Sequence, residues 1–229
     1  MISIIVPTYN ERGNIEVLIQ KIFKVAGQSK LDLEVIVVDD DSPDQTWRVA
    51  QELKAEYKNL QVLRRLGKKG LASAVIDGLK IARGDIIGVM DADLSHPPDL
   101  ILSLIEPLIN GKADLAIASR YIPGSDVENW PLAREAISKV AILLAKPLVK
   151  EIKDPTAGYF FFKKEVIEGV ELNPRGFKIG LEVFVKGRYN KAVEVPYTFR
   201  NRKRGESKFG IREIFNYLIQ LLKLYAHRS

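Results

Sequence analysis

The chain has 229 residues, of which 46% are hydrophobic and 28% are charged, and its net charge is +6. This composition is that of an ordinary globular domain, and it excludes a disordered chain, a collagen-like chain and a coiled coil. Because the chain has no cysteine, it also excludes disulfides, thiol nucleophiles and cysteine-bound zinc. The sequence shows neither a run of about 18 apolar residues nor a signal-peptide pattern, so we expect a peripheral protein on the cytoplasmic face of a membrane or in the cytosol.

Short apolar runs alternate with helical patterns through the first half of the chain. In chain order, they predict strands at 2–6, 33–38, 60–64, 85–90 and 113–119, and helices at 14–25, 44–57, 70–82 and 97–110. Asp44 is expected to cap the second helix, and Pro97 and Pro98 to open the fourth. This alternation predicts an α/β fold with a doubly wound, mostly parallel sheet flanked by helices, whose ligands bind at the carboxyl ends of the strands.

The second half of the chain is less regular. It predicts a helix at 131–150 that Pro147 kinks or ends, a strand at 158–163, a helix at 177–188, a strand at 192–195, a basic loop at 200–208 and a last helix at 211–227. No internal repeat or long linker interrupts the chain. We therefore expect one domain over residues 1–229.

Aspartates follow two of the predicted strands. Asp39 and Asp40 come after the second strand, and Asp91 and Asp93 after the fourth. Asp91 and Asp93 are two residues apart, so on an extended segment their carboxylates point to the same side. Two such carboxylates suit a hard cation, Mg²⁺ or Mn²⁺, which keeps water and phosphate oxygens as its other ligands. The alternative is a solvated acidic loop.

Five separated segments resemble one enzyme family in order along nearly the whole chain. They are residues 6–11 (VPTYNE), 38–46 (VDDDSPDQT), 91–98 (DADLSHPP), 154–159 (DPTAGY) and 200–209 (RNRKRGESKF). The first three are similar to family 2 glycosyltransferases of the GT-A fold. The last two narrow the resemblance to the dolichyl-phosphate (polyprenyl-phosphate) mannosyltransferases, also called dolichol monophosphate mannose synthases. Ser95 stands where family members often have Gln, which bears on metal affinity.

The resemblance implies a GDP-mannose donor and a metal held by Asp91, Asp93 and Ser95. It implies that a second set of residues binds the donor nucleotide: Pro7, Tyr9, Glu11, Asp39, Asp40, Asp91 and Ala92. Residues 1–120 would form the nucleotide-sugar half and residues 121–210 the acceptor half. Arg65, Lys68 and Lys69 are either neighbours of the diphosphate or solvated surface charges.

The family's acceptor is a dolichyl or polyprenyl phosphate. By resemblance, its phosphate is expected to contact Arg120, Arg134, Ser138, Lys178, Arg202 and Lys208, with Arg120 also a catalytic residue alongside the two metal-binding aspartates. Arg134 and Ser138 are four apart on a helix and so share a face. An arginine fork beside a hydroxyl suits a phosphate oxyanion, although surface ion pairs are the commoner role of such arginines. Asp154 is expected to orient one of these cations or the sugar, or else to form a turn before Pro155.

The last predicted helix lies within the C-terminal segment, residues 211–229. Its apolar arc is too wide to be exposed to water on every side. Its polar stripe is Arg212, Asn216, Gln220, Lys223 and His227. Either the whole arc packs on the sheet, or part of it lies on a membrane surface with the basic groups at the lipid headgroups. Many family members carry transmembrane helices after this point. We therefore expect a catalytic-domain-only member with a transmembrane partner, or a chain whose transmembrane segment is missing.

A phosphate acceptor is already nucleophilic at neutral pH, since its second pKa lies near 6. The resemblance therefore implies an inverting transfer without a dedicated general base, and His96 is expected to be structural. Three alternatives remain open. One is a UDP-glucose-dependent polyprenyl-phosphate glucosyltransferase, and another is a polysaccharide-chain transferase, although the Gln-x-x-Arg-Trp motif of processive members is missing. The third is a basic nucleic-acid-binding module, which the acidic strand ends disfavour, so no nucleic acid partner is expected.

Overall fold

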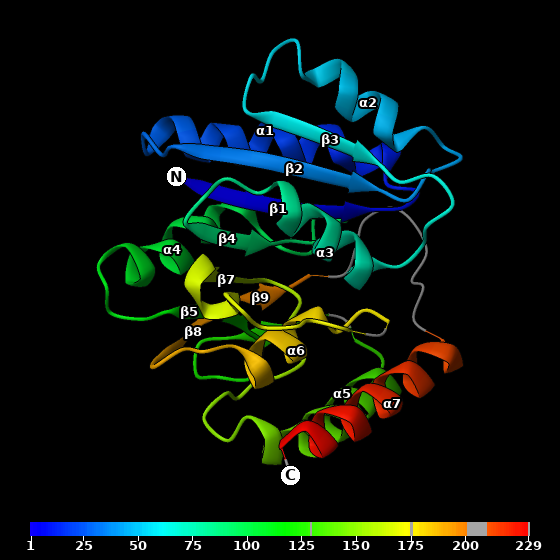
Figure 1. The fold of residues 1–229 in the computed structure, drawn as a ribbon, viewed down its shortest axis with the longest axis vertical. Helices are drawn as coiled ribbons and strands as arrows, with labels where there is room; N and C mark the ends of the chain where they lie inside the picture. The colour runs from blue at the N-terminus through cyan, green and yellow to red at the C-terminus, as the bar shows by residue number, and fades with distance from the viewer. Residues whose placement is uncertain (129, 175, 201–209, 229) are drawn as a thin grey trace.

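Seven strands form one sheet in the computed structural model, which describes residues 1–128, 130–174, 176–200 and 210–228. They are β1 (Ile2–Thr8), β2 (Leu33–Asp39), β3 (Leu60–Arg64), β4 (Ile86–Val89), β5 (Leu115–Ser119), β7 (Phe160–Lys163) and β8 (Ala192–Pro196). Their spatial order is β3-β2-β1-β4-β7-β5-β8 (Figure 1). In the described sheet only β7 is antiparallel to its neighbours, β4 and β5, so the predicted mostly parallel, doubly wound sheet is confirmed.

Helices cover both faces of this sheet. They are α1 (Arg12–Gln28), α2 (Thr46–Leu53), α3 (Leu71–Ile81), α4 (Ile101–Ile109), α5 (Leu132–Ala145), α6 (Ile179–Lys186) and α7 (Ile211–Arg228). One core cluster joins the sheet to α1, α2 and α4, and the other joins it to α3, α6 and α7 (Figure 1). Every residue of β1 and β2 is buried, as their nearly continuous apolar runs predict for strands covered on both faces.

Helix α2 differs from the sequence prediction at both of its ends. The helix expected to reach residue 57 ends at Leu53, and Tyr57 instead stacks on Phe23 of α1 with ring centroids 4.5 Å apart. At its start, the Asp44 carboxylate accepts a hydrogen bond from the Thr46 N–H at 3.0 Å, although the N-cap position itself is Gln45. The long helix ends at Ala145, where a 3₁₀ turn (Lys146–Leu148) contains Pro147, as expected.

The structure has a second, two-stranded sheet that the sequence did not predict. In this sheet β6 (Asp126–Val127) pairs in parallel with β9 (Thr198–Phe199). Two-residue strands are too short to show an alternating pattern. This pairing brings the segment before α5 to the segment after β8, and so joins two distant parts of residues 121–200.

Helix α7 packs along α5, and the two lie side by side in Figure 1. The Tyr217 hydroxyl donates to the carbonyl of Ala141 at 2.6 Å, and the Tyr225 hydroxyl donates to that of Leu144 at 2.7 Å. Over the described residues, no helix combines the length and hydropathy that a bilayer crossing requires.

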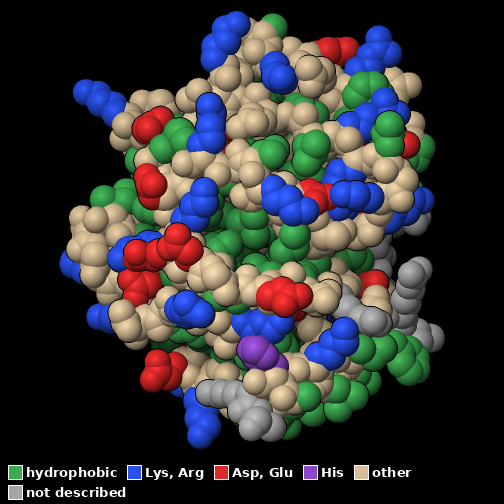
Figure 2. Space-filling model, viewed as in Figure 1, with side chains coloured by type: hydrophobic (Ala, Val, Ile, Leu, Met, Phe, Trp, Pro, Cys, Tyr) green, Lys and Arg blue, Asp and Glu red, His purple; other side chains and the backbone are tan. Residues whose placement is uncertain are grey.

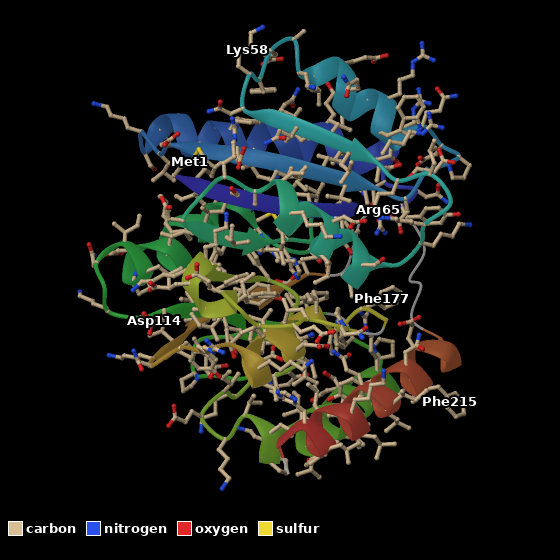
Figure 3. The ribbon with its side chains drawn as sticks, viewed as in Figure 1. Met1, Lys58, Arg65, Asp114, Phe177 and Phe215 are labelled. Atoms are coloured by element: carbon tan, nitrogen blue, oxygen red, sulfur yellow. The ribbon has the colours of Figure 1, made fainter. Side chains whose placement is uncertain are left out.

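The carboxyl ends of the parallel strands share one edge of the sheet. Figure 3 shows Arg65 and Phe177 toward that edge, and Met1 and Asp114 toward the opposite one. Loops from both halves of the chain therefore meet beyond the strand ends, where a doubly wound sheet places its ligand.

Candidate active site

A cavity of about 320 Å³ opens at the carboxyl end of the sheet. It brings together most of the residues predicted for the site: Pro7, Tyr9, Glu11, Asp40, Asp91, Ala92, Asp93, Ser95, Arg120, Arg134 and Lys178. Asp39 and Ser138 are not among the residues that line it. Arg202 and Lys208 lie outside the described residues. Donor, metal and acceptor candidates from both halves of the chain thus share one cavity.

Asp39 joins the ends of two strands. Its Oδ2 accepts hydrogen bonds from the hydroxyls of Thr8 at 2.7 Å and Ser42 at 2.6 Å, and its Oδ1 accepts from the Ser42 N–H at 2.8 Å. The residue is fully buried. These bonds fix the loops after β1 and β2, whereas a direct contact of Asp39 with a nucleoside stays a prediction.

Asp40 is held by a buried arginine. Arg65 donates to the Asp40 carboxylate through both Nε and Nη2, and to Asp77 of α3 at 3.3 Å. Because these two carboxylates take its donors, Arg65 is buried. It is therefore not the solvated surface charge that the sequence allows, and it does not line the cavity, while its place near a diphosphate stays a prediction.

The same pair shapes the segment before α3. The Gly70 N–H donates to Asp40 at 2.6 Å, and the Gly70 carbonyl accepts from Arg65 at 3.0 Å. Gly70 has a φ of 126°, a conformation that favours glycine. The preceding Lys69 lines the cavity with its ammonium 5.6 Å from the centroid of the Tyr9 ring. Lys69, rather than Arg65, is the cation that this segment presents to a ligand.

His96 supports the loop that carries Asp91. Its Nδ1 accepts a hydrogen bond from the Asp91 N–H at 3.0 Å, which leaves the proton on Nε2, 3.7 Å from the Asp91 carboxylate. The ring is buried and stacks on Tyr159 with centroids 5.0 Å apart. These contacts give His96 the structural place that the sequence suggests.

Ser95 contacts Asp93 directly. Both the Ser95 N–H, at 3.0 Å, and its hydroxyl, at 2.5 Å, donate to Asp93 Oδ1. The turn between them has Leu94 in the left-handed region, with a φ of 64°. Ser95 therefore orients the carboxylate, and its own coordination of a metal stays a prediction.

The donor set decides whether a divalent cation fits here. Within the described ranges, no group of three His, Cys, Asp or Glu side chains lies close enough to hold a metal ion. Asp91 and Asp93 nevertheless both line the cavity, and the Asp91 side chain is 36% exposed. Mg²⁺ is commonly bound by one or two carboxylates plus waters and substrate phosphates. The two aspartates thus fit Mg²⁺ or Mn²⁺ if a bound substrate completes the coordination.

A buried ion pair between Arg120 and Asp154 forms part of the cavity wall. Arg120 donates through Nε to Asp154 Oδ2 at 2.7 Å and through Nη2 to Asp154 Oδ1 at 2.8 Å, with a further bond to the Thr156 hydroxyl at 2.9 Å. Burial opposes the charge of both groups, but their attraction outweighs it. The attraction between them therefore raises the pKa of Arg120 and lowers the pKa of Asp154. Of the roles expected for Asp154, the structure shows that it orients one of the cations, Arg120.

Arg134 reaches the cavity from α5 and stacks on an aromatic side chain. Its guanidinium lies 4.4 Å from the centroid of the Trp130 ring, and that of Arg120 lies 5.6 Å from it. Phe199 of β9 packs edge-on against Trp130 at 5.3 Å. Sequence reasoning missed both aromatic residues, because only the β6–β9 pairing brings them beside the arginines. Ser138 accepts instead from the Tyr121 hydroxyl at 2.8 Å.

Lys178 adds a third cation to this end of the cavity. Its ammonium donates to the carbonyl of Thr156 at 3.0 Å. Burial, reinforced by the nearby charge of Arg120, lowers the pKa of Lys178 to about 8. The cavity is therefore lined by two carboxylates, Asp91 and Asp93, and by the cations Arg120, Arg134 and Lys178. It can hold a cation-bound diphosphate and a second phosphate side by side.

Comparison with known proteins shows which family this chain belongs to. A model of glycosyl transferase family 2 matches residues 3–170. The dolichol-phosphate mannosyltransferase of Pyrococcus furiosus is 54% identical over 226 residues, which cover 97% of this chain and 63% of that protein. The chain thus spans less than two thirds of that relative. The dolichol-phosphate mannosyltransferase of Saccharomyces cerevisiae is 36% identical over 236 residues, covering 99% of this chain and 87% of the relative.

Solved structures share the fold at low sequence identity. Mannosyl-3-phosphoglycerate synthase from Rubrobacter xylanophilus has a TM-score of 0.70 at 20% identity, covering 100% of this chain and 73% of that one. Glucosyl-3-phosphoglycerate synthase from Mycobacterium tuberculosis, in complex with Mn²⁺, UDP and glucosyl-3-phosphoglycerate, has a TM-score of 0.67 at 20% identity and covers 100% and 79%. These likenesses support the fold.

Proposed function

This chain belongs to glycosyl transferase family 2, and from that membership and the geometry of the cavity we propose that it transfers mannose from GDP-mannose to a dolichyl or polyprenyl phosphate. The observation that carries the proposal is that one cavity is lined both by a pair of carboxylates, Asp91 and Asp93, and by a set of cations, Arg120, Arg134 and Lys178. A nucleotide-sugar diphosphate with its cation suits the carboxylates, and a phosphate monoester suits the cationic set.

The proposed reaction is a single displacement. A phosphate oxygen of the acceptor forms a bond to the anomeric carbon of mannose, while the bond from that carbon to the GDP phosphate oxygen breaks and GDP leaves with the electron pair. The acceptor is largely dianionic at neutral pH and needs no proton removed. Attack from the face opposite the leaving group inverts an α-linked donor to a β-linked product. An α-linked product in the NMR spectrum would contradict this path.

The chain's own residues place and stabilise the two phosphates. Arg120, fixed by Asp154, and Arg134, stacked on Trp130, would hold the acceptor phosphate in line with the anomeric carbon. Asp91 and Asp93, oriented by His96 and Ser95, would hold Mg²⁺ or Mn²⁺. A bound divalent cation stabilises negative charge on a departing diphosphate.

The donor nucleotide would lie against the loops after β1, β2 and β4. Pro7, Tyr9, Glu11, Asp40 and Ala92 line this part of the cavity. A carboxylate there can accept from base N–H groups or ribose hydroxyls, and an aromatic ring can flank the base. In this proposal, residues 1–120 bind the donor and residues 121–210 the acceptor, and Arg202 and Lys208 stay predicted contacts of the lipid phosphate.

The acceptor carries a long isoprenoid tail, so the enzyme should act at a membrane surface. Large apolar side chains are exposed along two packed helices: Ile137, Val140, Leu143 and Leu144 of α5, and Ile214, Phe215, Leu218, Ile219, Leu222 and Tyr225 of α7. Figure 2 shows hydrophobic side chains gathered along the lower right edge, where these helices lie. A patch of this kind suits a lipid surface. We propose peripheral attachment at the cytoplasmic face.

The test is transfer of radiolabelled mannose from GDP-mannose to a short polyprenyl phosphate, with and without EDTA. We expect a chloroform-extractable labelled product that needs a divalent metal and is lost in Asp91→Ala. UDP-glucose in parallel tests the glucosyltransferase alternative, and thermal stabilisation by GDP or UDP with Mn²⁺ reports the nucleotide preferred. Product from UDP-glucose and none from GDP-mannose would overturn the choice of donor.

A further inference from the structure

A second cavity, of about 580 Å³, lies between α6, α7 and the segment at residues 169–173. It shares no lining residue with the active cavity. Figure 2 shows both basic and acidic side chains near the place where α6 and α7 meet in Figure 1. Nothing in the proposed transfer reaction uses this hollow.

Most of the charge that lines the second cavity is positive. Lys186 is neutralised by the buried Glu182, with the ammonium 2.7 Å from the carboxylate. Arg188, Lys223 and His227 also line the cavity, and their side chains make no hydrogen bond or ion pair with any of the residues that the structure describes. Glu171 lines the cavity as well, so the lining has three Lys or Arg side chains against the two carboxylates of Glu171 and Glu182, and the positive charge that remains attracts an anion.

A buried amide supplies an independent observation. Gln220 is 2% exposed and lines the cavity, and its Nε2 donates to the Lys178 carbonyl at 2.9 Å and to Glu182 at 3.3 Å. Both partners are acceptors, so the amide cannot be flipped. Its Oε1 is buried and has no hydrogen-bond partner among the described residues. A buried acceptor of this kind needs an O–H or N–H donor.

The helix separates this cavity from the apolar surface. Gln220, Lys223 and His227 are three and four residues apart and form one stripe of α7, whereas Phe215 and Leu222 project from another side and are 61% and 70% exposed. The second half of the polar stripe expected at lipid headgroups therefore lines this cavity, where Lys223 and His227 are exposed to solvent. A ligand from solution reaches this stripe more readily than the headgroups of a bilayer that covers the apolar side.

We propose that the second cavity binds a small phosphate-bearing anion from solution, held by Arg188, Lys223 and His227. A singly protonated phosphate, or a phosphate ester with a free hydroxyl, also carries the donor that Gln220 Oε1 lacks. This site is independent of the sugar-transfer proposal. It depends only on charge, cavity and the unpaired amide oxygen.

The chain offers a direct readout because it has only two histidines, His96 and His227. The probe is inorganic phosphate, titrated at constant ionic strength with chloride while the imidazole signals are followed by NMR, with His227→Gln used to assign them. We expect the His227 signals to move along a saturable curve. Lys223→Ala and Arg188→Ala should each weaken the apparent affinity by about tenfold, because a charge-assisted hydrogen bond is lost. The matched control Lys24→Ala, an exposed lysine of α1, should leave the affinity unchanged.

Three results would overturn the proposal. The first is a His227 signal that does not move, or moves equally with chloride. The second is an unchanged affinity in both Lys223→Ala and Arg188→Ala when their thermal unfolding shows them folded. The third is a shift caused by phosphatidylglycerol vesicles but not by inorganic phosphate, which would make a lipid headgroup the ligand. Arg134→Ala should leave the His227 shift intact, which separates this site from phosphate bound in the active cavity.

Discussion

Arg120 and Asp154, 34 positions apart in the chain, form a two-point ion pair in which Nε and Nη2 each contact one carboxylate oxygen, at 2.7 and 2.8 Å. Asp154 is fully buried, and the Arg120 side chain is 10% exposed. The remaining terminal nitrogen, Nη1, makes no hydrogen bond within the described residues and is left for a ligand. The pair thus fixes a cation whose outer edge lines the cavity.

The first prediction concerns removal of the carboxylate of Asp154. Asp154→Asn should lower the free energy of unfolding by about 3 kcal/mol, because a buried arginine loses its counter-charge. The pKa of Asp154 is lowered in the folded state, so this stabilisation is present above about pH 4 and is lost as the pH falls further. Urea unfolding at pH 7 and at pH 3 measures it. Asp99→Asn, at an exposed site, is the control. Equal urea midpoints for Asp154→Asn and the parent protein at pH 7 would contradict the prediction.

Lys178 gives the second prediction, a pH dependence. Its ammonium form carries the charge for the acceptor phosphate, and its pKa of about 8 means that this charge is lost at mildly alkaline pH. The kcat/KM for polyprenyl phosphate should fall about tenfold per pH unit above pH 8. Lys178→Met should start lower and stay flat between pH 7 and 9.5. Lys112→Met, an exposed lysine, should keep the parent profile. A parent profile that is flat to pH 9.5 would remove Lys178 from acceptor binding.

The sheet was largely predictable because its signals are local. β1 and β2 are covered on both faces, and their runs of Ile and Val show it in the sequence. The motif residues after β1, β2, β4 and β5 also fall at one sheet edge, because parallel strands bring their carboxyl ends together. The family resemblance is confirmed by the match over residues 3–170.

The features that the sequence did not predict depend on contacts between residues far apart in the chain. The segment at 64–70 reads as a basic surface loop, and only Asp40 and Asp77, from two other elements, make Arg65 a buried residue. Trp130 meets Arg134 and Phe199 through strands of two residues, which carry no periodic signal. The direction of β7 is likewise set by its neighbours β4 and β5 rather than by its own phenylalanines.

The third prediction tests the two aspartates as metal ligands. Asp91→Asn and Asp93→Asn should each lower activity by about 100-fold or more, since a bound metal supplies several kcal/mol to the departure of a diphosphate. Isothermal titration should show weakened Mn²⁺ binding in the presence of GDP. Asp99→Asn lies on the same segment, is exposed, and should behave as the parent. Mn²⁺ affinity equal to that of the parent in both variants would place the metal elsewhere.

Ser95 provides the fourth prediction. Ser95→Ala removes the 2.5 Å hydrogen bond to Asp93 without adding bulk to a buried site. Mn²⁺ affinity should fall about 10- to 100-fold, the usual effect of losing a group that orients a metal ligand. Titration with Mn²⁺ and GDP measures the change. Ser103→Ala, on the exposed side of α4, is the matched control. If Ser95→Ala binds Mn²⁺ as tightly as the parent, the hydroxyl neither orients Asp93 usefully nor coordinates the ion.

The fifth prediction concerns the apolar surface of α5 and α7. Leu143 and Leu222 are 71% and 70% exposed, so replacing either by aspartate leaves the core intact but puts a charge where lipid is expected. Each of Leu143→Asp and Leu222→Asp should weaken binding to polyprenyl phosphate vesicles by about tenfold or more, because an apolar contact of a kcal/mol or more is lost. Vesicle co-sedimentation measures this, and thermal stabilisation by GDP and Mn²⁺ should not change. Leu66→Asp is the matched control, since Leu66 is 69% exposed on the loop before α3. If it reduces sedimentation as much as the other two substitutions, the surface of α5 and α7 does not bind the membrane specifically.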